Sequence, residues 1–388
     1  MAKAVEERVT TAVKAEGVSF TVDHEAIMNV LTTCSKVVPR SSVVPILKCI
    51  KFDLNKDVLF VTAMSDSQSV IVKLQVENTG NQDGSYLFPS REGIELVKRL
   101  PSGSLSFSVN EASVRISYGN NGSASLKVLD PDEYPQLPSV AGVKFVPVPM
   151  DALRKGAAAQ RFASTDSSTA ILCGINIRKV EDKLGFTATN RHRIYDFVSD
   201  VKIPNPDEFR GGVIDAINFK SIVDTFRTSE RIDFAVTDHH LILRDRSSNS
   251  VYFGRLVEGS YPDIAKLCEM PEQSCLARIP LGRLDETLNR MLSLESENHR
   301  VYFLHGDNGE LVVKSESHTG EIVESIEGSV VDKSMGMIRF NARYLRDALS
   351  ASDRDVNDVL FNITGQSTPS YITYDGDPSV LNVVLPVR

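Results

Sequence analysis

The histidines and acidic clusters of this sequence are the first places to look for chemistry. His239 and His240 are adjacent at a predicted strand turn, where neighbouring side chains point to opposite faces and chelate a metal ion poorly. Asp130, Asp132 and Glu133 offer the oxygen donors that a divalent cation prefers, although a solvated loop is the simpler interpretation. We expect ordinary surface residues at both places.

No motif in the sequence ties a nucleophile to a base. The patterns GxxxxGK[ST], HExxH and GxSxG are absent, as is GxGxxG after a predicted strand. The 5 cysteines are scattered without a CxxC pair, which is typical of reduced thiols in a cytosolic protein and not of disulfides or a zinc site. We therefore predict no catalytic residues, no cofactor and no metal. A site assembled in three dimensions leaves no local pattern, so an enzyme of unrelated fold remains an alternative.

Composition and charge set further limits. The 388 residues are 41% hydrophobic and 24% charged, with a net charge of −8, which argues against a generally basic nucleic-acid binder but allows a basic face. No apolar run approaches the roughly 18 residues that span a bilayer. Residues 1–17 carry charges throughout and lack the apolar core of a signal peptide. These features predict a cytoplasmic protein that does not contact a membrane.

A short pattern recurs three times at equal spacing. The segments LSFSV, IDFAV and VLFNI occupy 105–109, 232–236 and 359–363, and each alternates apolar with small or polar residues. Such alternation is typical of a half-buried strand. Three evenly spaced copies indicate a chain built from three similar units. Each unit is long enough to bury a core of its own, so the units are domains and not solenoid repeats.

Each unit contains two copies of a strand, a helix and then antiparallel strands, which predicts an α+β fold with the helices together on one side of the sheets. For the charge comparison the helices are taken as 23–40, 90–101, 150–165, 216–231, 282–300 and 341–354, and those of the third unit are predicted near 281–292 and 341–350. Strand hairpins are predicted at 45–63 and at 170–188. The units end at Tyr134-Pro135 and Tyr261-Pro262. The predicted parts are an N-terminal extension at 1–17 and domains at 18–140, 141–271 and 272–388.

Charge is distributed unevenly between the helices and the rest of the chain. The predicted helices are slightly basic in sum, so the remaining residues carry more than the whole net charge of −8. If the helices share one face, that face attracts phosphate while the outside repels it. Ordinary scatter of charges over solvated helix surfaces explains the same distribution, and the sequence leaves both interpretations open.

Short motifs in a fixed order resemble one known family. They are Val44-Pro45-Ile46-Leu47, Tyr134-Pro135-Gln136-Leu137-Pro138, Ala188-Thr189-Asn190-Arg191-His192-Arg193, Leu256-Val257-Glu258-Gly259-Ser260-Tyr261-Pro262-Asp263, Phe340-Asn341-Ala342-Arg343-Tyr344-Leu345 and Leu385-Pro386-Val387-Arg388. From Phe20 to Arg388 the chain is similar to the bacterial DNA polymerase III beta subunit, the DNA sliding clamp.

The resemblance implies three similar clamp domains, each with two helices packed on antiparallel sheets, that form half of a six-domain ring. Two chains would close head to tail as a homodimer around double-stranded DNA, whose phosphates are contacted without reading the bases. The protein would be a processivity factor and not an enzyme. Candidates for the DNA-binding channel are Lys36, Arg40, Arg99, Lys155, Arg161, Lys220, Arg227, Arg231, Arg290 and Arg346.

The resemblance also implies a groove between the second and third domains. It would bind a short peptide of the replicative polymerase, the clamp loader or other replication and repair proteins, with apolar pockets for the anchors. The groove residues carried over by motif are Leu172, Thr189, Arg191, His192, Arg193, Ile194, Pro262, Lys266, Leu267, Asn341, Tyr344, Ser370, Val383, Leu385, Pro386, Val387 and Arg388. For Leu172 and Val383, a place in the domain core is an equal alternative.

Two positions depart from the family pattern. Arg191 stands where the family usually has Gly, and Lys266 stands where Arg is common, which removes a planar fork of donors. The peptide preference of this chain is therefore expected to differ. The alternative to a processivity clamp is a clamp-like protein of a plasmid or mobile element that mainly recruits a partner.

Overall fold

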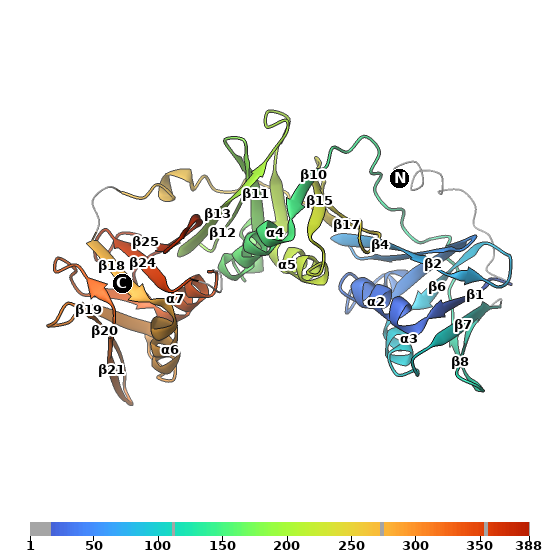
Figure 1. Cartoon of the computed structure of the whole chain (residues 1–388), viewed down its shortest axis with the longest axis horizontal. Helices are drawn as coiled ribbons and strands as arrows, with labels where there is room; N and C mark the ends of the chain where they lie inside the picture. The colour runs from blue at the N-terminus through green and yellow to red at the C-terminus, as the bar shows by residue number, and fades with distance from the viewer. Residues whose placement is uncertain (1–16, 111–112, 272–274, 353–355, 388) are drawn as a thin grey trace. The chain divides into compact units, whose positions relative to one another are not determined.

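The computed structural model describes residues 17–110, 113–271, 275–352 and 356–387. It forms two compact units, one made of Met1–Met150 with Asn218–Leu256 and the other of Asp151–Ile217 with Val257–Arg388. Both combine helices with antiparallel sheets (Figure 1), which confirms the predicted α+β class. Except for Gly17, the predicted extension at 1–17 lies outside the described residues.

The first unit contains two sheets, with the strand orders β5-β1-β7-β8-β9 and β10-β15-β16-β17-β4-β3-β2-β6. Its strands are β1 Ser19–Asp23, β2 Cys49–Asn55, β3 Val58–Met64, β4 Gln68–Gln75, β5 Glu77–Asn78, β6 Gly84–Pro89, β7 Ser104–Val109, β8 Ser113–Tyr118, β9 Gly122–Lys127, β10 Val146–Pro149, β15 Arg231–Val236, β16 His240–Asp245 and β17 Ser250–Arg255. Its helices are α2 His24–Ser35, α3 Ser90–Val97 and most of α5 Ala216–Thr225.

The second unit contains a sheet of order β14-β11-β12-β13-β26-β25-β24-β18-β22 and a sheet of order β21-β20-β19-β23. Its strands are β11 Gly174–Val180, β12 Lys183–Thr189, β13 Arg193–Lys202, β14 Gly212–Asp215, β18 Cys275–Pro280, β19 Arg300–His305, β20 Leu311–Ser317, β21 Gly320–Ile326, β22 Val330–Val331, β23 Ile338–Asn341, β24 Asp358–Ile363, β25 Ser370–Tyr374 and β26 Asp377–Val384. Its helices are α4 Met150–Ala158, α6 Leu281–Met291 and α7 Ala342–Leu349.

Strand pairing repeats the same topology three times. The strand before each first helix pairs with the strand after the second helix, as β1 with β7, β10 with β15 and β18 with β24. The next pairs are equally regular: β2 with β6, β11 with β14 and β19 with β23. The segments at 105–109, 232–236 and 359–363 all lie in these strands. The internal repeat predicted from the sequence is therefore confirmed.

The start of helix α2 agrees with the local sequence signals, whereas its end differs from the prediction. The Asp23 carboxylate accepts hydrogen bonds from two backbone amides of the first turn, and Ile27 and Leu31 are fully buried on the inner face. The predicted helix extended to residue 40, but α2 ends at Ser35. A residue that precedes proline is excluded from helical conformation, and Pro39 follows two β-branched valines.

Two further boundaries had different outcomes. The helix predicted near 281–292 is confirmed as α6, Leu281–Met291, after which the Ser293 hydroxyl donates to the Arg290 carbonyl and competes with the helical backbone bonds. The predicted strand from residue 170 was wrong at its start, because Asp166 caps a 3-10 turn over Ser167–Cys173 and the strand begins only at Gly174. A polar capping side chain decides that boundary, whereas the prediction had followed only the apolar pattern.

Both large sheets run through the predicted domain boundaries. Strand β17, from the predicted second domain, pairs with β4 from the first, and β13 pairs with β26 from the third. The predicted second domain consequently contributes to both compact units. The division into 18–140, 141–271 and 272–388 remains a prediction based on the repeat.

Candidate functional site

The tight turn between β12 and β13 carries the Arg-His-Arg segment. The Thr189 hydroxyl donates to the Arg193 carbonyl at 2.7 Å and accepts from the Arg191 amide at 3.1 Å. The Asn190 carboxamide oxygen accepts from the backbone amides of His192 and Arg193. Arg191 adopts a φ of 74°, in the left-handed region. Glycine occupies this region without steric cost, so a larger residue here stores about 1 kcal/mol of strain.

Arg193 is only 7% exposed and has a structural role. Its guanidinium lies 4.4 Å from the ring centroid of Tyr344 and 5.1 Å from that of Phe162. It also forms an ion pair with Asp347 and donates to the Arg161 carbonyl. Because its guanidinium is engaged in these contacts, Arg193 fixes the base of the turn.

Arg191 and His192 differ from Arg193, because both are exposed. The His192 ring stacks on Tyr344 with 6.3 Å between ring centroids. Arg191 lies near Asp166, whose pKa is lowered by hydrogen bonds from Ser168 and, to a smaller extent, by the Arg191 charge. The turn therefore presents one cationic and one aromatic side chain on top of a fixed arginine.

Two of the apolar residues predicted for the groove belong to one buried cluster. Ile194 and Val383 pack with Ile264 and Tyr371, and both are less than a tenth exposed. Leu172, Thr189 and Ser370 are buried as well, while Leu267 remains 47% exposed. Pro262 and Lys266 are exposed, and Asn341 caps α7 by accepting from two backbone amides.

The end of the chain lies beside the same turn. The Leu385 amide donates to the His192 carbonyl at 2.9 Å, and the Val387 amide donates to the Arg339 carbonyl at 2.8 Å. Leu385, Pro386 and Val387 are half-buried, and Arg388 lies outside the described residues. Hydrogen bonds thus hold the tail between the turn before β13 and strand β23.

The predicted channel cations fall into two groups. The first group is exposed and has no ion pair with any described residue: Lys36, Arg40, Arg161, Arg227 and Arg231. The second group is paired with nearby carboxylates: Arg99, Lys155, Lys220, Arg290 and Arg346. Sequence alone had treated all ten as equivalent.

The described residues offer little other chemistry. Within the described ranges, no group of three or more His, Cys, Asp or Glu side chains is arranged to hold a metal ion. The Asp130 carboxylate accepts from the Asp132 amide, as in an ordinary loop. All five cysteines are free, and burial raises the pKa of Cys34 and of Cys268, the latter to about 12, so these thiols stay protonated. None of the described helices has the length and apolar character needed to cross a bilayer.

Two partners of the turn were not predicted from the sequence. Phe162 and Asp347 hold Arg193, although neither belongs to a motif of the turn. Asp347 lies three residues after Tyr344 on α7, a spacing that puts both side chains on one helix face. That spacing is the sequence signal from which Asp347 could have been predicted as a partner of the turn.

Comparisons with known proteins agree with this fold. Family models of the DNA polymerase III beta subunit match its N-terminal domain at residues 18–138 and its central domain at 148–263. Beta sliding clamps of Staphylococcus aureus and Staphylococcus epidermidis are 26% identical over 380 residues, which cover 95% of this chain and 99% of theirs.

Solved structures give the same result. The DNA polymerase sliding clamp of Bacillus subtilis matches with a TM-score of 0.86 at 24% identity, covering 96% of this chain and 99% of that chain. The beta subunit of Thermotoga maritima matches with a TM-score of 0.84 at 19% identity, with the same coverage. The fold is therefore that of a DNA sliding clamp. The chain belongs to the family of bacterial DNA polymerase III beta subunits, as its motifs predicted.

Proposed function

We propose that two copies of this sliding clamp close into a ring around double-stranded DNA and hold the replicative polymerase on its template. The observation that carries this proposal is the threefold repeat of strand pairing, since six equivalent domains from two chains can close a ring. The chain would act in the cytoplasm as a processivity factor without catalytic residues of its own. Its three domains would be 18–140, 141–271 and 272–388.

Open sheet edges support a joint between two chains. Among the strands that end a sheet, β9 and β21 are long, while β5 and β22 have two residues each, β14 and β23 have four residues each, and β10 contains two prolines. The remaining long end strand, β6, is bridged through Leu87 to Leu129. Edges such as β9 and β21 expose unpaired backbone groups, which pairing with a second copy would satisfy.

The exposed cations support contact with DNA. Lys36, Arg40, Arg161, Arg227 and Arg231 are available to phosphate, while the chain as a whole carries a charge of −8. An acidic body with a few free cations gives weak contacts to phosphate, which permit sliding. Encirclement, and not affinity, would then keep the protein on DNA.

The turn before β13, helix α7 and the C-terminal tail support a peptide groove. The half-buried Leu385 donates its amide to the His192 carbonyl, and the turn exposes Arg191 and His192. Leu267, whose amide donates to Ile264 of the buried cluster, is 47% exposed. Apolar surface with a few fixed polar groups suits a short peptide with apolar anchors. The polymerase, the clamp loader and other replication proteins would supply such peptides.

Encirclement is tested by retention on DNA of different topology. A labelled chain is loaded onto closed circular and onto linear duplexes with a bacterial clamp loader, and the protein that remains bound is measured over time. We expect long retention on circles and rapid loss from linear ends. Equal loss from both forms would contradict the ring.

The groove is tested by deleting residues 385–388. This deletion should abolish binding of a polymerase-derived clamp-binding peptide, measured by fluorescence anisotropy, while sedimentation shows the same oligomeric state as the full chain. Unchanged peptide affinity would contradict the placement of the groove. A deletion that instead produced monomers would place the tail at the joint between chains.

A further inference from the structure

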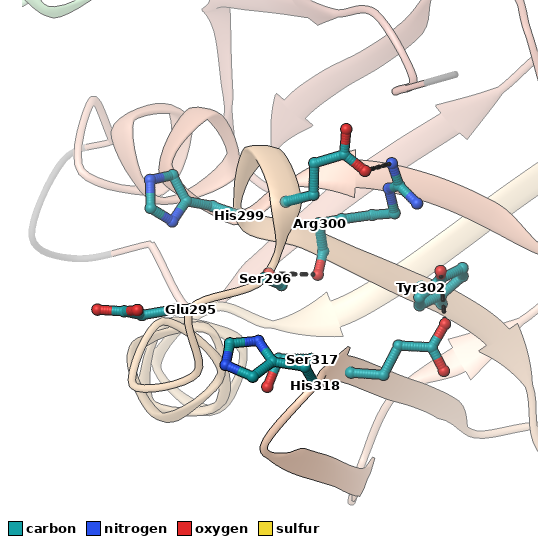
Figure 2. A pocket seen from close by; sticks show the side chains of 9 residues that line it. Glu295, Ser296, His299, Arg300, Tyr302, Ser317 and His318 are labelled. Atoms are coloured by element: carbon teal, nitrogen blue, oxygen red, sulfur yellow. Dashed lines mark hydrogen bonds and ion pairs between the residues drawn. The ribbon is translucent and has the colours of Figure 1, made fainter.

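A polar pocket with a volume of about 690 Å³ opens beside the four-stranded sheet of the second unit. The loop after α6 contributes Glu295 and Glu297, strand β19 contributes Arg300 and Tyr302, and the end of β20 contributes Glu316. Figure 2 shows Glu295 and His299 at one side of the pocket and Tyr302 at the other. The proposed peptide groove shares none of these residues.

The pocket has more negative than positive charge. Arg300 is paired with Glu297 at 3.0 Å, whereas the exposed Glu295 has no ion pair with a described residue. The Tyr302 hydroxyl donates to Glu316 at 2.8 Å, and this bond together with Lys314 lowers the pKa of Glu316. Three carboxyl side chains, one guanidinium, His299 and His318 line the pocket, and the Lys314 ammonium contacts Glu316 from beside it. The acidic groups outnumber the Arg300 and Lys314 cations, which favours a cationic ligand.

Lys314 neutralises only part of the adjoining surface. Its ammonium lies 3.1 Å from Glu316 and 3.0 Å from Glu321, so two carboxylates share one positive charge. Glu321 belongs to β21, whose outer edge pairs with no described strand. The acidic pocket consequently reaches the open edge of the sheet.

The direction of strand pairing determines which residue of a second copy would lie at the end of β21 that is next to the pocket. Every strand pair of the described residues is antiparallel, including the hairpin of β20 and β21. If β9 of a second copy pairs with β21 in the same sense, the C-terminal end of β9 lies beside Gly320, next to the pocket. The residue at that end is Lys127.

The exposed faces of the two strands agree with this placement. On β9 the exposed side chains are Ser123, Ser125 and Lys127, and on β21 they include Glu321 and Val323. In a joined sheet these side chains would share one surface, because residues two apart on a strand point the same way. Lys127 would then stand over Glu321 and, one strand further, Glu316.

We propose that this acidic pocket is a recognition site for a second copy of the chain, in which Lys127 of one copy binds against Glu316 and Glu321 of the other. The inference rests on the proposed ring and adds the charge contact that fixes the register of its joint. A register slip of one residue turns Lys127 to the opposite face, so this contact selects one alignment of the two edges.

A charge-swap cycle tests this proposal. The full chain and the variants Lys127→Glu, Glu316→Lys and the double variant are compared by sedimentation over a wide concentration range at 50 and 500 mM salt. We expect each single variant to raise the dimer dissociation constant about tenfold or more at low salt, and the double variant to recover most of the loss. Thermal unfolding curves establish that each variant is folded.

Two further variants keep the result interpretable. Glu316→Gln preserves the shape of the side chain and should weaken the dimer less than Glu316→Lys. Glu310→Lys makes the same charge change at the residue before β20, at the end of that strand away from Glu316, and should leave the dimer unchanged.

The outcomes separate this inference from the ring itself. A wild-type chain that stays monomeric at every concentration would overturn both. If the wild type dimerises but the single variants have the same dimer dissociation constant, the Lys127 contact is overturned and the ring remains. The same holds if the double variant does not regain the affinity lost in the single variants.

Discussion

The predicted channel cations of the first unit differ from those of the second in how they are held. In the first unit, Lys36, Arg40, Arg227 and Arg231 are exposed and make no ion pair with a described residue, whereas Arg99 is paired with Glu95 and Lys220 with Asp224. In the second unit, most of the corresponding cations are paired: Lys155 with Asp377, Arg290 with Glu324 and Arg346 with Asp285. Most candidate cations of the first unit are thus free, whereas in the second unit only Arg161 is free of ion pairs with described residues.

This difference separates two uses of a basic side chain. A cation already bonded to a carboxylate contributes little field at short range, and binding phosphate would require breaking its ion pair. A free cation can release counterions from DNA without any loss inside the protein. We therefore expect the free group to control DNA binding and the paired group to control stability.

The largest effect is expected at Arg193, the most deeply engaged cation. Arg193→Ala should lower the free energy of unfolding of the second unit by about 3 kcal/mol, because it leaves Asp347 and the Arg161 carbonyl without their partner. Urea unfolding of the full chain measures this change. Arg193→Lys should give an intermediate loss, since it keeps the charge but not the planar fork. A loss below about 0.5 kcal/mol for the alanine variant would show that the contacts are incidental.

A smaller effect, of a different kind, is expected for the free cations. The double variant Arg227→Ala, Arg231→Ala should reduce the slope of log affinity against log salt by about 1.8 for a linear duplex, at about 0.9 for each lost phosphate contact. Stability should change by less than about 0.5 kcal/mol. Arg290→Ala, whose side chain is bonded to Glu324 at 2.7 Å, is the matched control and should leave the salt slope unchanged. Equal slopes for both variants would erase the distinction between the groups.

The smallest effect concerns Lys155 and Asp377, whose side chains are 19% and 12% exposed. Burial raises the pKa of Asp377, but hydrogen bonds from Lys155 and Ser379 outweigh it, so the net pKa lies below the usual value. Stability from this group is therefore complete above the unfolded pKa of about 3.9 and is lost as the pH falls through the lower folded pKa.

Unfolding of the wild type and of Asp377→Asn at pH 6, 4 and 3 measures this contribution. The wild type should be more stable by about 1 kcal/mol at pH 6, and the difference should shrink below about pH 4. Lys155→Met should show the same flattening, because it removes the other member of the pair. If the difference in stability stayed constant down to pH 3, the pKa of Asp377 would be the same in the folded and unfolded states, which would contradict this prediction.

The parts predicted correctly from the sequence depend on local patterns. Alternating residues identified the repeated strands, and Asp23 marked the start of α2. The pairing of Lys155 with Asp377 could not be predicted, because the two residues are 222 positions apart and nothing local connects them. The same holds for β13 and β26, and for the role of Arg193, whose side-chain partners come from two separate segments, 161–162 and α7. Sequence motifs identified the family, but only the fold distinguishes an arginine that holds a turn from one that is free to bind.

The position of β26 has a consequence for how the protein is made. This strand, Asp377–Val384, completes the nine-stranded sheet by pairing with β13, which ends at Lys202. At a synthesis rate of 5–20 residues per second, β13 waits roughly 10 to 40 s on the ribosome before its partner is made. Throughout that interval one edge of β13 stays unpaired, and unpaired edges readily join other chains. The nascent second unit thus passes through an aggregation-prone stage that ends only when the last strand emerges, whereas the sheets of the first unit can close soon after Arg255 has been synthesised.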